Sequence, residues 1–509
     1  MEITAIYSLS LPILICLPLL SACLSNTARA WQFAEIFGAT SLLIALFAWV
    51  AFVFLGATFN LMDWLAITPL RATLLLLVSF IAYIVLRYAR TNFNADADSA
   101  RFLRWLTLTI FAVTLTVISN HLAAFWLAWA SISLSMHKLL VFYPSRYRAV
   151  LAAHKKFIFA RLAELCLAAA FFLLYDYHDS YLISEILQQY PAAHISWQQQ
   201  AAAILLGIVA LIKCAQLPLH GWLIQVVESP TPVSALLHAG VINLGGFLIL
   251  LFAPLFSQVA WAQWVVLIVA GLTTAFAALV MMTRISVKVR LAWSTTAQMG
   301  LMLVECALGL YELALLHLVA HSCYKAHAFL SAGSTVSDAI KHQYTGKSQP
   351  SMSAWLTAAG ISILIIASIK LTLTITAPFS PWALITIALT VSLAIRLTQS
   401  VSFALLKGVA DALMLMTLYL LFKFGASYLL PHITHAYSWQ ADAVIGGLFL
   451  GIFAVYLFLE YRPLSSASRR LFIALNAGFY LDEWSTRLAL RVWPIRLPKN
   501  DRNDLLLLK

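Results

Sequence analysis

The chain of 509 residues is 62% hydrophobic and only 10% charged, with a mean hydropathy of +0.89. Soluble domains carry roughly 45–50% apolar and about 25% charged residues, so this composition excludes a soluble globular protein and indicates a polytopic membrane protein. The net charge of +12 fits attraction to anionic lipid headgroups, and no nucleic-acid-binding motif accompanies it.

Runs of about 20 apolar residues predict an all-α membrane protein with about 15 transmembrane helices, within a range of about 13 to 15. The first run, near 4–24, lacks the basic start of a signal peptide and leads directly into another apolar run, so we interpret it as a span. The other spans are predicted near 34–56, 67–86, 103–119, 121–143, 157–175, 201–222, 232–256, 260–282, 289–309, 311–332, 353–374, 380–399, 409–430 and 440–459.

Basic residues gather in alternate loops, and this bias sets the predicted orientation because cytoplasmic loops are rich in Lys and Arg. Most of the 32 basic residues fall inside when the N-terminus is outside and the C-terminus is cytoplasmic. The segment 176–200 contains acidic residues but no Lys or Arg, as an outer loop should. We therefore expect a multi-pass membrane protein with this orientation.

The segment 461–509 interleaves arginines with large apolar residues, which is typical of an amphipathic tail on the cytoplasmic side. Two interpretations stay open, since such a tail either lies on the membrane or docks a partner protein. The residues predicted to dock a partner are Phe479, Leu481, Asp482, Glu483 and Trp484.

Several ionisable residues lie inside apolar runs, where each costs at least ~2.5 kcal/mol on insertion scales. His317, His321 and Lys325 recur at i, i+4 and i+8, so one helix face carries three titratable groups about 6 Å apart. This spacing favours a proton relay, with Glu164 and Glu305 as matching acids. The alternatives are ordinary hydrogen bonds to neighbouring helices, or a zinc site at His317 and His321 for which no third ligand is evident.

A broken helix is the strongest local feature of the sequence. Lys213 is followed by Pro218 and Pro230, which interrupt an apolar run, and proline removes a backbone hydrogen-bond donor. A broken helix in lipid must line a cavity or an ion path. We expect Glu228, at the break, to orient the half-helix or to pair with a base such as His238.

Three blocks resemble the antiporter-like membrane subunits of respiratory complex I and of Mrp-type cation/proton antiporters. They are KCAQLPLHGWLIQVVESPTPVSALLHA, KVRLAWSTTAQMG and HLVAHSCYKAHAFLSAGS. The resemblance implies inverted repeats of five helices, each with a broken helix. It also implies that Lys213 is the central proton carrier and that Lys325 continues a hydrophilic axis with His238, His317 and His321.

The same resemblance divides the chain into five predicted parts. They are N-terminal transmembrane helices (1–100), a first antiporter-like repeat (101–256, with the broken helix at 213–232), a second, degenerate repeat (257–400), C-terminal transmembrane helices (401–460) and the cytoplasmic tail (461–509). Ion-pumping members carry a glutamate after a tryptophan in the fifth helix, whereas this chain reads Trp129-Ala130-Ser131. We expect Glu164, one helix later, to replace that glutamate as the partner of Lys213.

Further stretches, including MHKLLVFYPSRYRAVLAAHKKFIFARLAEL and ALNAGFYLDEWSTRLALRVWP, are similar to the membrane subunits of DAB-type inorganic-carbon pumps. This resemblance implies a complex with a DabA-like cytoplasmic protein that holds a zinc site like that of β-carbonic anhydrases. Carbon chemistry is implied by the resemblance alone, since no composition or spacing indicates it. No cofactor or metal is expected in this chain.

The sequence therefore predicts a transporter subunit, not an enzyme, that conducts H⁺ or Na⁺ inward and couples this flux to CO2 hydration in the partner, so that bicarbonate accumulates. The alternatives are a proton-translocating subunit of a complex I-like oxidoreductase, an Mrp-type Na⁺/H⁺ antiporter subunit, or a passive membrane anchor. The predicted path involves Glu164, Lys213, Glu228, His238, Glu305, His317, His321 and Lys325.

Overall fold

The structure, a computed structural model, describes residues 27–55, 59–93, 96–192, 194–334, 349–373, 378–398, 404–430 and 438–494. The predicted span near 4–24 lies outside the described residues. Ten described helices are long and apolar enough to cross a membrane, so the chain is a multi-pass helical membrane protein as predicted. The expected total of about 15 spans stays a prediction.

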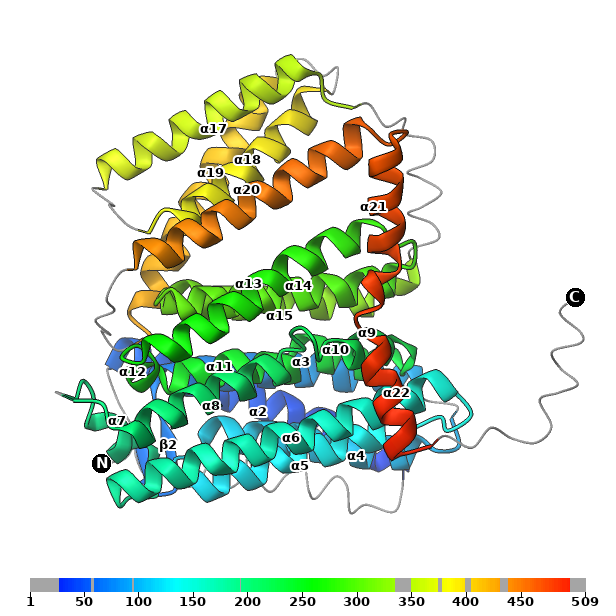
Figure 1. Cartoon of the computed structure of the whole chain (residues 1–509). Coiled ribbons are helices and arrows are strands. Elements are labelled where there is room, and N and C mark those ends of the chain that lie inside the picture. The colour runs from blue at the N-terminus through cyan, green and yellow to red at the C-terminus, as the bar shows by residue number, and fades with distance from the viewer. Residues whose placement is uncertain are drawn as a thin grey trace, which may run out of the picture.

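The N-terminal part of the described chain forms a tightly packed bundle of long helices (Figure 1). A two-stranded antiparallel hairpin, β1 (Phe59–Met62) and β2 (Leu65–Ile67), is a small departure from the all-α prediction. The helices here are α2 (Thr27–Leu55), α3 (Pro69–Asn92), α4 (Ser99–Ile118), α5 (Leu122–Leu140), α6 (Tyr147–His178), the short α7 (Ile183–Gln188) and α8 (Trp197–Lys213).

The predicted span 201–222 is wrong at its end, because α8 stops at Lys213. Ala215 follows with a positive φ of 52°, and the N–H of Gln216 donates to the carbonyl of Leu211 instead of continuing the helix. After this break come the short helices α9 (Gly221–Gln225), η1 (Val226–Glu228), α10 (Thr231–Ala239), η2 (Val241–Asn243), α11 (Leu244–Leu251) and α12 (Ala253–Phe256).

The segment Thr231–Leu251 lies at the centre of the bundle, since 94% of its most apolar stretch is buried. It packs against α3, α8 and α15. Next to it lie α13 (Ala260–Met282), α14 (Val287–Ala307) and α15 (Tyr311–Leu330), followed by η3 (Ala332–Ser334).

A second group of helices is attached to the outside of this bundle. It consists of α17 (Met352–Thr372), α18 (Ser380–Leu397), α19 (Ala404–Ser427) and α20 (Trp439–Tyr461). Only 17% to 39% of the most apolar stretch of each of these helices is buried within the chain, so most of their surface is not covered by other parts of the structure. The predicted inverted repeats and domain boundaries stay predictions.

The C-terminal segment crosses one end of both groups (Figure 1). It contains α21 (Ser466–Asn476), η4 (Gly478–Tyr480) and α22 (Glu483–Val492). Gly478, Phe479 and Tyr480 all have positive φ, so the chain turns a sharp corner between the two helices. This geometry lets one segment contact both α13 and α6.

Candidate functional site

Lys213 lies in a small cavity where the broken helix begins. Its ammonium group lies 4.5 Å from the centre of the Trp129 ring. The cavity has a volume of about 30 Å³, which is room for a water molecule. Lys156, Glu164 and Trp222 line the same cavity, so groups from α5, α6, α8 and α9 meet there.

Glu164 is buried in this cavity, as its predicted role as partner of Lys213 requires. Its carboxylate accepts hydrogen bonds from Ser133 (2.5 Å) and Arg161 (2.7 Å). No direct ion pair joins Glu164 to Lys213 among the residues that the structure describes. The two groups therefore face a shared cavity, and transfer between them requires a side-chain movement or a bridging water.

Lys156 is a cavity residue that sequence reasoning missed. The predicted span 157–175 excludes Lys156, but α6 begins at Tyr147 and buries it. The ammonium of Lys156 donates to the carbonyl of Ser133 at 3.0 Å. Its spacing of eight residues from Glu164 is the signal that places both on one helix face.

Lys325 forms a second buried site between α14 and α15. Its side chain is fully buried, and its ammonium donates to the carbonyl of Leu291 (3.1 Å) and to Ser294 (2.9 Å). His238 is bonded to Thr295 through Nδ1 at 3.1 Å. The second nitrogen of His238 and both ring nitrogens of His321 are buried without a hydrogen-bond partner in the described part of the chain.

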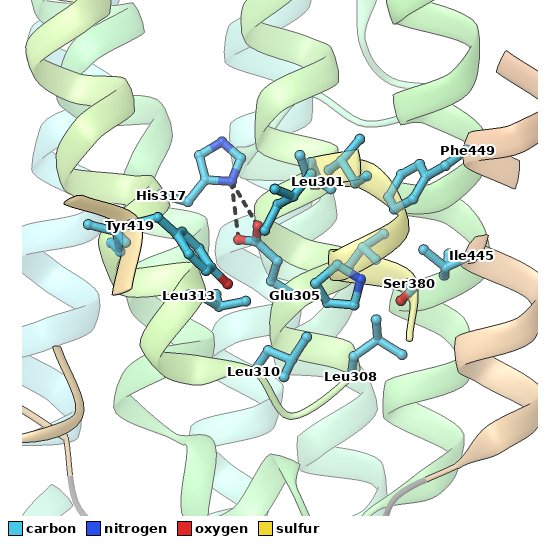
Figure 2. A pocket seen from close by; sticks show the side chains of 15 residues that line it. Leu301, Glu305, Leu308, Leu310, Leu313, His317, Ser380, Tyr419, Ile445 and Phe449 are labelled. Carbon is cyan, nitrogen blue, oxygen red and sulfur yellow. Dashed lines mark hydrogen bonds and ion pairs between the residues drawn. The ribbon is translucent and has the colours of Figure 1, made fainter. Parts of the chain in front are cut away.

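Glu305 and His317 meet in a separate cavity of about 160 Å³, which Figure 2 shows. The Nδ1 of His317 lies 3.1 Å from one carboxylate oxygen of Glu305. Tyr419 and Ser380 line the same cavity from the peripheral helices. The ring centres of His317 and His321 are 6.2 Å apart, which matches the spacing predicted for the helix face.

The structure contradicts the predicted pairing of Glu228 with His238. His238 is fully buried and bonded to Thr295, whereas Glu228 is half-exposed and lies 3.9 Å from Arg148. The prediction is wrong because η1 turns the Glu228 side chain outward at the bundle surface. Glu228 therefore lies outside the buried groups of the predicted path.

The predicted docking residues divide into two sets. Phe479, Leu481, Glu483 and Trp484 are exposed to a large extent. Asp482 instead points into its own chain, where its carboxylate lies 2.8 Å from the ammonium of Lys155. This contact joins residues 327 positions apart in the sequence, and the sequence analysis does not predict it.

The two histidines of the alternative zinc site, His317 and His321, differ in their contacts. His317 is bonded to Glu305, whereas neither ring nitrogen of His321 has a hydrogen-bond partner in the described part of the chain. Within the described ranges, no group of three His, Cys, Asp or Glu side chains is arranged to hold a metal ion.

A helix that breaks beside a lysine-lined cavity, inside a multi-pass helical bundle, is a feature of secondary transporters. Residues 119–393 match a family described as NADH:quinone oxidoreductase/Mrp antiporter, TM. A subunit of the Mrp complex from Dietzia sp. has the same fold, with a TM-score of 0.62 and 18% identity over 98% of this chain. This chain covers 61% of the length of that subunit.

Individual relatives identify a narrower group within this family. A probable inorganic carbon transporter subunit DabB from Hydrogenovibrio crunogenus is 48% identical over 93% of this chain and 92% of its own length. Subunit DabB2 from Halothiobacillus neapolitanus, also described as probable, is 38% identical over 84% and 80%. NADH-quinone oxidoreductase subunit L from Rhodobacter capsulatus is 32% identical, but this chain covers 46% of its length. The chain therefore belongs to the antiporter-like membrane family, within its branch of DabB inorganic carbon transporter subunits.

Proposed function

We propose that this chain is the cation-conducting membrane subunit of an energy-coupled inorganic-carbon transporter in the bacterial inner membrane. H⁺ flows inward, with the N-terminus outside and the C-terminus in the cytoplasm. The flux drives CO2 hydration in a DabA-like cytoplasmic partner with a zinc site, so that bicarbonate accumulates. The names of the DabB relatives support the carbon cargo, and the family resemblance supports the zinc partner.

The Lys213 cavity is the single observation that carries this proposal. Three cations, Lys156, Arg161 and Lys213, surround the carboxylate of Glu164 in or beside a cavity with room for water. Each charged group buried inside a membrane costs on the order of several kcal/mol. A passive membrane anchor would not need groups that are this costly. A carboxylate between lysines can receive a proton and return it with little movement.

The second buried site supplies a continuation of the path. Glu305 and His317 share a cavity, and His321 lies on the next turn of the same helix as His317. Lys325 follows one further turn along α15. We propose that protons move between these groups by side-chain reorientation, with His238 on α10 connecting them toward the broken helix.

The energy available from this flux is sufficient for the coupling. One elementary charge crossing 100 mV releases about 2.3 kcal/mol. Since about 1.4 kcal/mol shifts an equilibrium tenfold, one inward proton biases hydration by well over tenfold.

The test is bicarbonate accumulation in cells that lack their own carbonic anhydrase, with this chain and the neighbouring gene for the zinc protein expressed together. We expect uptake with the natural chain, and loss of uptake with Lys213→Ala or with a protonophore. Lys138→Ala is the matched control, because Lys138 is an exposed lysine at the end of α5. Retained uptake in Lys213→Ala, with the complex assembled, would favour the passive-anchor interpretation.

If the assembled complex accumulates no bicarbonate, the carbon proposal fails. Sodium-dependent proton movement in inverted vesicles would then support the antiporter interpretation.

A further inference from the structure

The C-terminal segment Ser466–Trp493, here called the strap, is fastened to the bundle at three places. Leu475 is buried in a cluster with Trp293 and Ala277. Asp482, in the middle, contacts α6 and α9. At the far end, the ring of Trp493 stacks on His154 of α6, with ring centres 4.0 Å apart and planes inclined by 7°.

Asp482 is the polar fastening of the strap. One carboxylate oxygen accepts hydrogen bonds from Lys155 (2.8 Å) and from the amide of Gln225 (2.9 Å). The other accepts a hydrogen bond from Ser485 at 2.5 Å, within the strap itself. The Lys155 side chain is fully buried, so Asp482 is the carboxylate that balances its charge.

Gly221 leaves the space that this carboxylate occupies. A β-carbon added at Gly221 would lie 1.4 Å from Oδ1 of Asp482, so any larger residue would push the carboxylate out. The strap thus rests directly on the backbone of α9. Gly221 does not have a positive φ, so the missing side chain matters here for space and not for backbone conformation.

Both walls held by Asp482 belong to the Lys213 cavity. Gln225 and Gly221 lie on α9, whose Trp222 lines that cavity. On the other side, Lys155 directly precedes Lys156, which lines it as well. A shift of Asp482 therefore moves two cavity walls at once.

We propose that the strap sets the geometry of the cation path, with Asp482 as the positioning residue that holds α6 and α9 around the Lys213 cavity. The proposal rests on the proposed function and deepens it.

Loss of the Asp482 charge leaves Lys155 buried without a counter-ion, which is strongly unfavourable. The chain responds by moving α6 or α9, and transfer through the cavity slows. Asp482→Asn is therefore expected to lower bicarbonate uptake by about tenfold or more, while the partner still co-purifies. Gly221→Ala displaces the same carboxylate from the opposite side and is expected to have a similar effect.

The experiment uses the full complex in the uptake assay described above, with co-purification of the partner and the amount of chain in the membrane measured for each variant. Asp176→Asn, an exposed carboxylate on α6, is the control for Asp482→Asn. Gly360→Ala, a helical glycine with open space around it, is the control for Gly221→Ala. Lys155→Gln combined with Asp482→Asn removes both charges, and we expect it to recover uptake, because two amides can replace the ion pair.

Natural uptake in Asp482→Asn would overturn the proposal. So would a loss of uptake that only follows a loss of co-purified partner, since Asp482 would then be a docking residue. Lys213→Ala, measured in parallel, distinguishes a failure of the proposed cation path from a failure of the proposed role of the strap. If Lys213→Ala transports normally, the proposed cation path fails. If it is inactive while Asp482→Asn is normal, only the role of the strap fails.

Discussion

The two lysines of the proposed path, Lys213 and Lys325, are held in different ways. Lys213 shares its cavity with the carboxylate of Glu164. Lys325 is held by neutral groups, the carbonyl of Leu291 and the hydroxyl of Ser294. The acid further along α14, Glu305, contacts His317. A carboxylate thus faces the cavity of Lys213, whereas neutral groups hold Lys325, and this difference fits the proton exchange proposed at the first lysine and the relay proposed at the second.

The largest effect on uptake is expected from removing the carboxylate in the Lys213 cavity. Glu164→Gln leaves Lys156, Arg161 and Lys213 together without their carboxylate, and buried charges without partners are costly. We expect bicarbonate uptake to fall on the order of 100-fold, at an unchanged level of chain in the membrane. Asp176→Asn serves as the control, and uptake in Glu164→Gln close to that control would remove Glu164 from the path.

A smaller effect is expected at the second lysine. In Lys325→Gln the amide still donates to Ser294, so the local structure is retained while the titratable group is lost. Uptake should fall by about tenfold. Lys423→Gln, a partly buried lysine of the peripheral helix α19, should transport normally. Equal losses in Lys325→Gln and Glu164→Gln would erase the distinction between the two sites.

His317→Gln separates proton relay from structural support. Glutamine can keep a hydrogen bond to Glu305 but cannot carry a proton as imidazole does. We expect uptake to fall by roughly threefold to fivefold, because neighbouring groups in the row partly replace the histidine. A purely structural role of His317 would leave the uptake rate of this variant unchanged.

The smallest effect on uptake is expected in the peripheral helices. Asp442 of α20 accepts hydrogen bonds from the backbone N–H groups of Phe379 (2.5 Å) and Ser380 (2.7 Å) at the start of α18. Asp442→Ala should cost about 2 kcal/mol of stability and lower the unfolding temperature in detergent. Uptake per folded molecule should stay the same, and a strong loss would show that the peripheral helices take part in the path.

Much of the fold could be predicted because the hydropathy of a membrane helix is local information. The span predicted at 260–282 is the helix Ala260–Met282, and the span predicted at 311–332 is Tyr311–Leu330. The hydropathy span 201–222 runs past the break because its residues stay largely apolar, whereas the prolines correctly predict a broken helix at 213–232. The helix ends at Lys213, where the backbone turns at Ala215, and hydropathy does not detect such a turn.

The site was predicted less completely, and for one physical reason. The predicted span 157–175 leaves Lys155 and Lys156 just outside the apolar run, so hydropathy does not predict that either lysine is buried. Whether such a lysine is buried depends on what covers it, and here Lys155 is covered by Asp482, which is 327 residues away. The row His317, His321 and Lys325 was recognisable because all three lie on one helix.

The long separation between Lys155 and Asp482 has a consequence for how the protein is made. During synthesis, α6 and the broken helix enter the membrane well before the ribosome reaches the strap. Until then Lys155 has no carboxylate beside it, and the walls of the Lys213 cavity are held by fewer contacts. The strap therefore completes the cavity late in synthesis, so a chain interrupted before Asp482 would enter the membrane with an unfinished ion path.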